Sequence, residues 1–173
     1  KIGRERIFSI LNKEIYSSKE LKSSLFLNRL IELLSDEGLS DLRFEKKTVE
    51  RCRRLRKWKT ENETNNVKNF NEDHRLKLHQ ELEEILPAFI SHLSFDTQKI
   101  WLQRWRNPSD PLFHPSYPID GLTLLKVLDL PEGPLLGAIM RLLCKEKAFG
   151  RLITKEEVIE FALYLKQQKY PLL

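Results

Sequence analysis

Glycine and proline are scarce in this sequence, with 6 glycines and 8 prolines among its 173 residues. Leucine, isoleucine, lysine and glutamate are common instead, and their side chains lose little rotamer freedom in a helix. A hydrophobic content of 40% excludes a disordered chain and allows a buried core in one helical domain or two small ones. No alternating strand pattern and no repeat of solenoid length occurs. We therefore predict an all-α fold.

Residues that commonly build metal and catalytic sites are also few. The only cysteines, Cys52 and Cys144, form no CxxC pair, which argues against a disulfide framework and a zinc site. His74 and His79 are five residues apart, so their rings would point to different sides of a helix and we expect no metal site. The GxxxxGK[ST], GxGxxG, GxSxG and HExxH motifs are absent. We expect no catalytic residue and no cofactor in this chain.

Long apolar runs are missing as well. No run approaches the roughly 20 residues that a membrane span requires, and no signal peptide opens the chain. We expect a soluble protein that contacts no membrane and is cytoplasmic or, in a eukaryote, located in the plastid stroma. The first residue is lysine rather than methionine, which indicates a fragment or a processed product.

Apolar periodicity predicts a helix at about residues 19–36. Ser17 or Ser18 would cap it, with Glu20 near the N3 position of a capping box. Gly38 would end it in the left-handed conformation that suits a C-terminal glycine.

Further helices are expected at residues 4–15, from about 73 to 94, and at 95–107, where Asp96 would be the cap. Pro87 predicts a kink or break in the second of these, because proline removes a helical hydrogen bond. The predicted organisation is a multi-helix body with a small C-terminal helical tail domain. Its parts are a helical body segment with a basic helix (1–60), a flexible polar joint (61–72), a helical segment (73–107), a Pro-rich non-helical connector (108–118) and the tail domain (119–173).

Positive charge is concentrated between residues 46 and 59, where Glu50 is the only acid. Such a strip repels itself unless an anion lies over it, and a phosphate backbone supplies regularly spaced negative charge. This predicts nucleic acid as the partner. The eight cations are Lys46, Lys47, Arg51, Arg53, Arg54, Arg56, Lys57 and Lys59.

The alternative interpretation is a solvated helix face. Val49, Cys52, Leu55 and Trp58 recur at i+3 steps and would seat the helix on a core, with the cations flanking this stripe.

A second group of residues, in the region 117–165, carries a family resemblance. It consists of Asp120-Gly121, Leu124-Leu125, Leu128, Leu130, Gly133-Pro134, Gly137, Leu142-Leu143, Gly150 and Thr154 to Glu157. This order resembles the C-terminal RNA-binding part of the bacterial-type tRNA nucleotidyltransferase and poly(A) polymerase family, the CCA-adding enzymes, in its cyanobacterial and plastid versions. Residues 25–58 are similar to the helical body of that family in pattern only. Leu122 and Thr123 depart from the family's usual polar residue and acid.

The resemblance implies that this chain supplies one part of a larger enzyme. The complete enzyme would add CCA, CC or A to tRNA 3′ ends, or poly(A), and its N-terminal catalytic head would bind Mg²⁺ and CTP or ATP. The motifs of that head are absent here, so the chain alone would be inactive. Its partners would be the catalytic head and the acceptor and T arms of tRNA, or another structured RNA, held by shape and phosphate contacts.

Candidate RNA-binding residues are basic side chains and two glycines. Asp120 or Thr123 can cap the helix after the connector, and Pro134 suits the first position of the next one. The two glycines would permit close approach of a neighbouring helix or of RNA, and both possibilities stay open. The candidates are Lys46, Lys47, Arg51, Arg53, Arg54, Lys57, Arg104, Arg106, Gly133, Gly137, Lys145, Lys147 and Arg151.

Two other classes of function remain. One is a free-standing helical nucleic-acid-binding module, which would bind generic duplex as well as a tRNA minihelix. The other is a helical protein-interaction domain that uses Trp58, Trp101, Trp105 and the Pro-rich connector.

Overall fold

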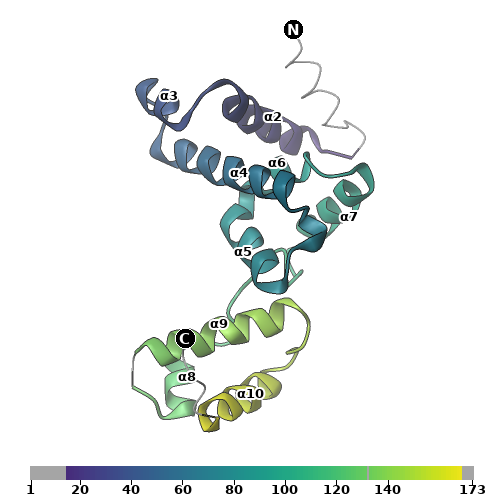
Figure 1. The fold of residues 1–173 in the computed structure, drawn as a ribbon. Coiled ribbons are helices and arrows are strands. Elements are labelled where there is room, and N and C mark those ends of the chain that lie inside the picture. Colours follow the sequence, from purple (N-terminus) through teal and green to yellow (C-terminus); the bar gives the residue numbers. More distant parts are fainter. Residues whose placement is uncertain (1–14, 132, 169–173) are drawn as a thin grey trace. The chain divides into compact units, whose positions relative to one another are not determined.

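The computed structural model describes residues 15–131 and 133–168. The described residues form helices joined by turns, with no strand among them, which confirms the all-α prediction. The chain divides into two compact units between Pro108 and Ser109 (Figure 1). Of the helix predicted at 4–15, only Ile15 lies within the described residues, and it is in a turn.

The first described helix, α2 (Ser18–Leu33), begins as predicted. Ser17 is its N-cap and forms a capping box with Glu20. The Glu20 N–H donates to Ser17 Oγ at 3.3 Å, and the Ser17 N–H donates to Glu20 Oε2 at 2.7 Å. Two of the helix's unsatisfied N-terminal donors are thereby paired.

The prediction that Gly38 ends this helix is wrong. Ser35 starts a new helix, α3 (Asp36–Asp41), by accepting a hydrogen bond of 3.0 Å from the Gly38 N–H. Gly38 is thus the third helical residue of α3, and the left-handed conformation belongs to Arg43, with φ of 58°.

The basic helix is α4 (Lys46–Thr64), and its four predicted apolar positions are buried. It continues beyond residue 60, where the polar joint was expected to begin. After it, Asn66 caps the short 3-10 helix η1 (Val67–Asn69). Val67 and Phe70 are buried in the first unit, which extends through residues 61–72 to Pro108.

The segment predicted as a helix from 73 to 94 contains three elements: α5 (Glu72–Leu82), the 3-10 helix η2 (Glu83–Ile85) and α6 (Leu86–Ile90). The break lies at Glu83, with φ of 32°, and not at Pro87, which occupies the first turn of α6 where its missing N–H is harmless. Every residue of α6 is buried, and α6 packs against α2, α4, α5 and α7 as the core of the first unit.

Helix α7 (Phe95–Arg106) closes the first unit. Its N-cap is Ser94, so the prediction that Asp96 caps it is wrong. Asp96 lies two residues beyond the cap position, in the first turn of the helix.

The second unit contains α8 (Gly121–Leu128), α9 (Pro134–Ala148) and α10 (Lys155–Gln167), which pack against one another (Figure 1). Before them, the Pro-rich residues 108–118 are non-helical, as predicted. The core of the unit is formed by Ile119, Leu124, Leu128, Ile139, Leu143, Leu152, Val158, Ala162 and Leu165.

Capping residues fix the ends of these three helices. Asp120 caps α8 by accepting from the Thr123 N–H at 2.9 Å, and Thr154 forms a capping box with Glu157 on α10. Pro134 takes the first position of α9, as predicted. Gly150, with φ of 74°, ends α9 in a Schellman motif in which its N–H donates to the Lys147 carbonyl.

Candidate nucleic-acid interface

Seven of the eight cations on α4 are paired with carboxylates of this chain; Lys46 has no such partner among the described residues. Only Glu50 comes from α4 itself, where it contacts Arg53 at 3.1 Å and Arg54 at 2.9 Å. The other acids are Glu32 on α2, Asp36 on α3, Glu81 on α5 and Glu84 on η2. The anion expected over this strip is therefore supplied largely by neighbouring elements of the fold.

The pairing is most extensive around Glu81. Its Oε2 accepts from Lys57 Nζ at 2.8 Å and from Trp58 Nε1 at 2.9 Å. Burial alone would raise the pKa of Glu81, but these two hydrogen bonds outweigh it and the pKa lies below its usual range. Glu81 is thus held ionised between a cation and a buried indole.

A second acid, Glu84, pairs with two cations near the start of the strip. It accepts from Arg51, which lowers the pKa of Glu84, and its Oε1 lies 3.5 Å from Lys47 Nζ. Such exposed pairs each contribute only about 0 to 1 kcal/mol. The most exposed of the paired cations are Lys47, with 69% of its side chain exposed, and Arg53, with 60%.

Arg106 joins two helices of the first unit. Its Nε donates to Glu20 Oε1 at 2.8 Å, and its Nη2 donates to the Ile15 carbonyl at 2.7 Å. The hydrogen bond from Arg106 lowers the pKa of Glu20 to about 2. Arg106 therefore ties the end of α7 to the start of α2, while Arg104 is half-buried on α7.

The predicted cations of the second unit have different surroundings. Lys147 Nζ donates to Ser116 Oγ at 2.9 Å, and Arg151 pairs with Glu146 while its guanidinium lies 5.5 Å from the centre of the Phe149 ring. Lys145 is half-buried on α9.

The two candidate glycines are not sites of tight helix packing within the described chain. A Cβ built at Gly133 would meet no atom within 4 Å, and one built at Gly137 would meet only Arg141 Nη1, at 3.6 Å. Gly133 has φ of 165°, an extended conformation that any residue can adopt. The helix-packing explanation of these glycines is therefore wrong for the described residues, and the surface beside them is open.

Arg141 was missed by the sequence reasoning. It is exposed and has no hydrogen bond or ion pair with a described residue. The spacing could have revealed it, because Gly137, Arg141 and Lys145 follow one another at i+4 steps on α9 and so share one helix face. We call these three residues the α9 row.

Net charge differs between the units. Residues 1–108 contain 22 Lys and Arg against 17 Asp and Glu, whereas residues 109–173 contain eight of each. The whole excess of +5 thus belongs to the first unit, and the second unit offers only local positive charge.

The tryptophans do not form an exposed interaction surface. Trp58 and Trp101 are buried, and Trp105 is half-buried and donates from Nε1 to the Glu83 carbonyl at 3.1 Å. Of the three rings that the protein-interaction hypothesis named, only Trp105 is partly exposed.

Within residues 15–131 and 133–168, no three His, Cys, Asp or Glu side chains are grouped so that they could hold a metal ion. None of the helices in these ranges is long and apolar enough to cross a membrane. Comparison of the chain with protein-family models, with curated proteins and with solved structures gives no match.

Proposed function

We propose that this chain binds structured RNA, with the acceptor and T arms of tRNA as the preferred partner, as the body and tail of a tRNA nucleotidyltransferase or poly(A) polymerase. The motif order between Asp120 and Glu157 supports the proposal. Within it, Asp120 and Thr154 cap their helices and Pro134 begins α9. The reaction, addition of CCA, CC or A to a 3′ end, or of poly(A), would belong to a catalytic head outside this chain.

The α9 row is the observation that carries the proposal. Glycine inside a helix costs about 1 kcal/mol relative to alanine, and close packing within the described chain does not account for Gly137. An open glycine lets a phosphate backbone come close to the helix, and Arg141, one turn later, is a cation without a competing partner among the described residues. A phosphate at this face would gain a charge-assisted hydrogen bond.

Helix α4 has a secondary part in this proposal. A phosphate that approaches Arg54 must compete with Glu50 and with the Glu81 carbonyl, to which Arg54 Nη1 donates at 3.3 Å. Lys46 and the highly exposed Lys47, at the start of the helix, are the more accessible cations. We therefore place the first contact on α9 and additional electrostatic attraction at the start of α4.

In this proposal Mg²⁺ and the nucleotides would be bound by the catalytic head, which lies outside this chain. The function of this chain would be to hold the RNA.

The test is a titration of the chain with a fluorescently labelled acceptor–T-arm minihelix and, separately, with a generic RNA duplex, at about 50 and 200 mM salt. We expect tighter binding of the minihelix and a steep loss of affinity with salt. Equal affinity for both RNAs would favour the free-standing nucleic-acid module instead. Absence of binding to either RNA would refute the proposal for this chain.

A matched pair of variants locates the contact. Arg141→Gln with Lys145→Gln removes two cations from the α9 row, and we expect the slope of log affinity against log salt to fall by about 1.5 to 2. Lys126→Gln with Lys155→Gln removes the same charge from exposed positions on α8 and α10. Equal falls of this slope in the two variants would mean that the RNA is attracted by the general positive charge and does not contact the α9 row.

A further inference from the structure

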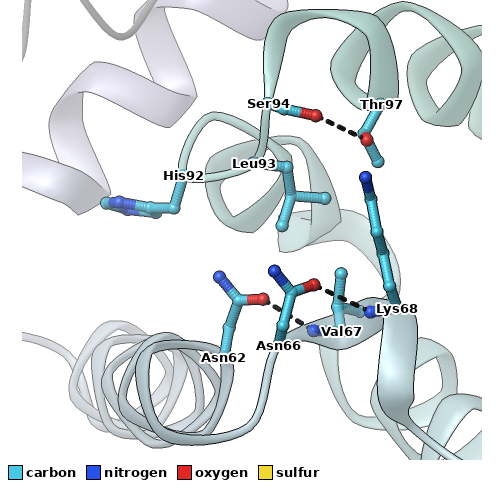
Figure 2. A pocket seen from close by; sticks show the side chains of 8 residues that line it. All are labelled: Asn62, Asn66, Val67, Lys68, His92, Leu93, Ser94 and Thr97. Atoms are coloured by element: carbon cyan, nitrogen blue, oxygen red, sulfur yellow. Dashed lines mark hydrogen bonds between the residues drawn. The ribbon is translucent and has the colours of Figure 1, made fainter.

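A small pocket in the first unit lies between the end of α4 and the turn that leads into α7 (Figure 2). Its volume is about 110 Å³, below the range of about 300 to 1,000 Å³ that is typical of pockets for drug-sized ligands. It is lined by Asn62, Asn66, Val67, Lys68, His92, Leu93, Ser94 and Thr97.

Both asparagines direct hydrogen-bond donors into this pocket. Asn62 Oδ1 accepts from the Val67 N–H at 3.0 Å, and Asn66 Oδ1 accepts from the Lys68 N–H at 3.0 Å. These bonds to backbone donors fix which end of each amide is oxygen. The two Nδ2 groups are the remaining ends, and Figure 2 shows both directed away from the backbone, towards Leu93.

Lys68 and a pair of hydroxyls complete the polar lining. The Lys68 side chain is exposed, has no ion pair with a described residue, and extends across the pocket towards Thr97 (Figure 2). Ser94 Oγ and Thr97 Oγ1 lie 2.7 Å apart, so one hydroxyl donates to the other and the second keeps its hydrogen for a ligand.

No lining residue is acidic. His92 turns away from the other lining side chains, and its Nε2 lies 2.7 Å from Asn28 Oδ1 on α2 (Figure 2). Asn28 Nδ2 donates to the Ala88 carbonyl and to Ser91 Oγ, so Asn28 Oδ1 is the acceptor and His92 the donor. Asp96 lies in the first turn of α7 but does not line the pocket. The pocket thus presents two amide donors, an ammonium and a hydroxyl, with no carboxylate.

We infer that this pocket binds a phosphate group. Several donors directed at one small space require a ligand rich in acceptors, and a phosphate offers oxygens in several directions, whereas a carboxylate offers two in one plane. The small volume suits a single phosphate group and excludes an enclosed nucleoside. The inference goes beyond the RNA contact proposed at the α9 row and does not depend on it.

The test follows the side-chain amide signals of Asn62 and Asn66 by NMR while the full chain is titrated with inorganic phosphate. Chloride at matched ionic strength and acetate are titrated in parallel. We expect both signals to shift saturably with phosphate, weakly with acetate and not with chloride. No shift with phosphate, an equal shift with chloride, or tighter binding of acetate would overturn the inference.

Two variants test the donors without removing the hydrogen bonds that shape the pocket. Asn66→Asp keeps an oxygen for the Lys68 N–H but replaces the amide donor by a negative charge, so we expect phosphate binding to be lost with the melting temperature retained. Lys68→Met should weaken phosphate binding about tenfold or more, whereas Lys22→Met, at an exposed position on α2 that has no ion pair with a described residue, should not. Equal binding by the Asn66→Asp variant and the parent chain would overturn the inference.

A final arm identifies the source of the phosphate. Minihelix RNA that shifts the same two amide signals would assign an RNA backbone phosphate to the pocket. Shifts with inorganic phosphate but not with RNA would assign a small phosphate compound. The Arg141→Gln, Lys145→Gln variant should bind inorganic phosphate as the parent does, so failure at the α9 row and failure at this pocket are distinguishable.

Discussion

Replacement of Gly137 by alanine should change stability and RNA binding in opposite directions. The new Cβ would lie 3.6 Å from Arg141 Nη1, an ordinary contact with the end of a flexible side chain, and would meet nothing else within 4 Å. Alanine in a helix is favoured over glycine by about 0.5 to 1 kcal/mol. We therefore expect the melting temperature to rise by about 1 to 4 °C if the chain unfolds as one, and more if the second unit unfolds alone.

The same change should weaken RNA binding, because the methyl group occupies the surface at which a phosphate backbone would approach. Thermal unfolding followed by circular dichroism measures the first effect, and minihelix titration measures the second. Gly121→Ala is the matched control: Gly121 is the first residue of α8 and also has open space beside it. It should leave minihelix affinity unchanged.

Two results would refute the reasoning. A lower melting temperature for Gly137→Ala would mean that the space beside Gly137 is filled, which contradicts the open α9 row. A higher melting temperature with unchanged minihelix affinity would mean that the glycine face is not where RNA approaches, and the proposed function would lose its main support.

Further predictions concern acid sensitivity and core packing. Glu20→Gln should lower the unfolding free energy at pH 7 by about 1 to 2 kcal/mol, because Arg106 holds the pKa of Glu20 at about 2; in urea unfolding the loss should shrink as the pH falls from 4.5 to 2. Burial lowers the pKa of His92 to about 4, so the unfolded chain binds a proton there that the folded chain does not, and stability should fall between pH 6.5 and 4; a ring that titrates at 6.5 by NMR would contradict this. Leu143→Ala, at a fully buried position of the second unit, should cost about 2 to 5 kcal/mol in thermal unfolding, and a cost below 1 kcal/mol would contradict the described core.

Local chemistry made several helix ends predictable. Ser17, Asp120 and Thr154 act as N-caps because their side-chain oxygens reach the N–H of the third helical residue, a contact within one turn. The failure at Gly38 has an equally local cause. Ser35 offers the same kind of cap, and a new helix start three residues earlier takes precedence over a glycine that suits a helix end.

The break in the segment 73–94 shows a different limit. Proline was the only visible interruption, yet the chain turns at Glu83, a residue type with no preference for positive φ. The reason is tertiary: the five apolar residues of α6 are buried against four other helices, and that requirement sets where α5 must end. Sequence periodicity within one segment cannot reveal such a constraint.

The basic strip was found in the sequence, but its partners were not. Its apolar stripe and its cations both lie on α4 as predicted. The acids that neutralise it lie far away in the chain, as in the pair Arg51 and Glu84, which are 33 residues apart, so only the folded arrangement brings them together. The sequence likewise does not show which cations lack an acidic partner. Arg141 has an ordinary sequence context and becomes a candidate only because no acid among the described residues pairs with it in the fold.

The difference between α4 and α9 determines how much each basic side chain can contribute to RNA binding. A phosphate that pairs with Arg53 or Arg54 replaces the carboxylate of Glu50 and brings that carboxylate close to the RNA, so one ion pair is exchanged for another. The net gain is small, because the attraction gained from the phosphate is offset by the attraction lost from Glu50. A phosphate that reaches Arg141 displaces no carboxylate of the described residues, and counterion release is what makes RNA affinity depend on salt. The measured salt dependence should therefore reflect the cations without an acidic partner among the described residues, such as Arg141 and Lys46, and not the seven paired cations of α4.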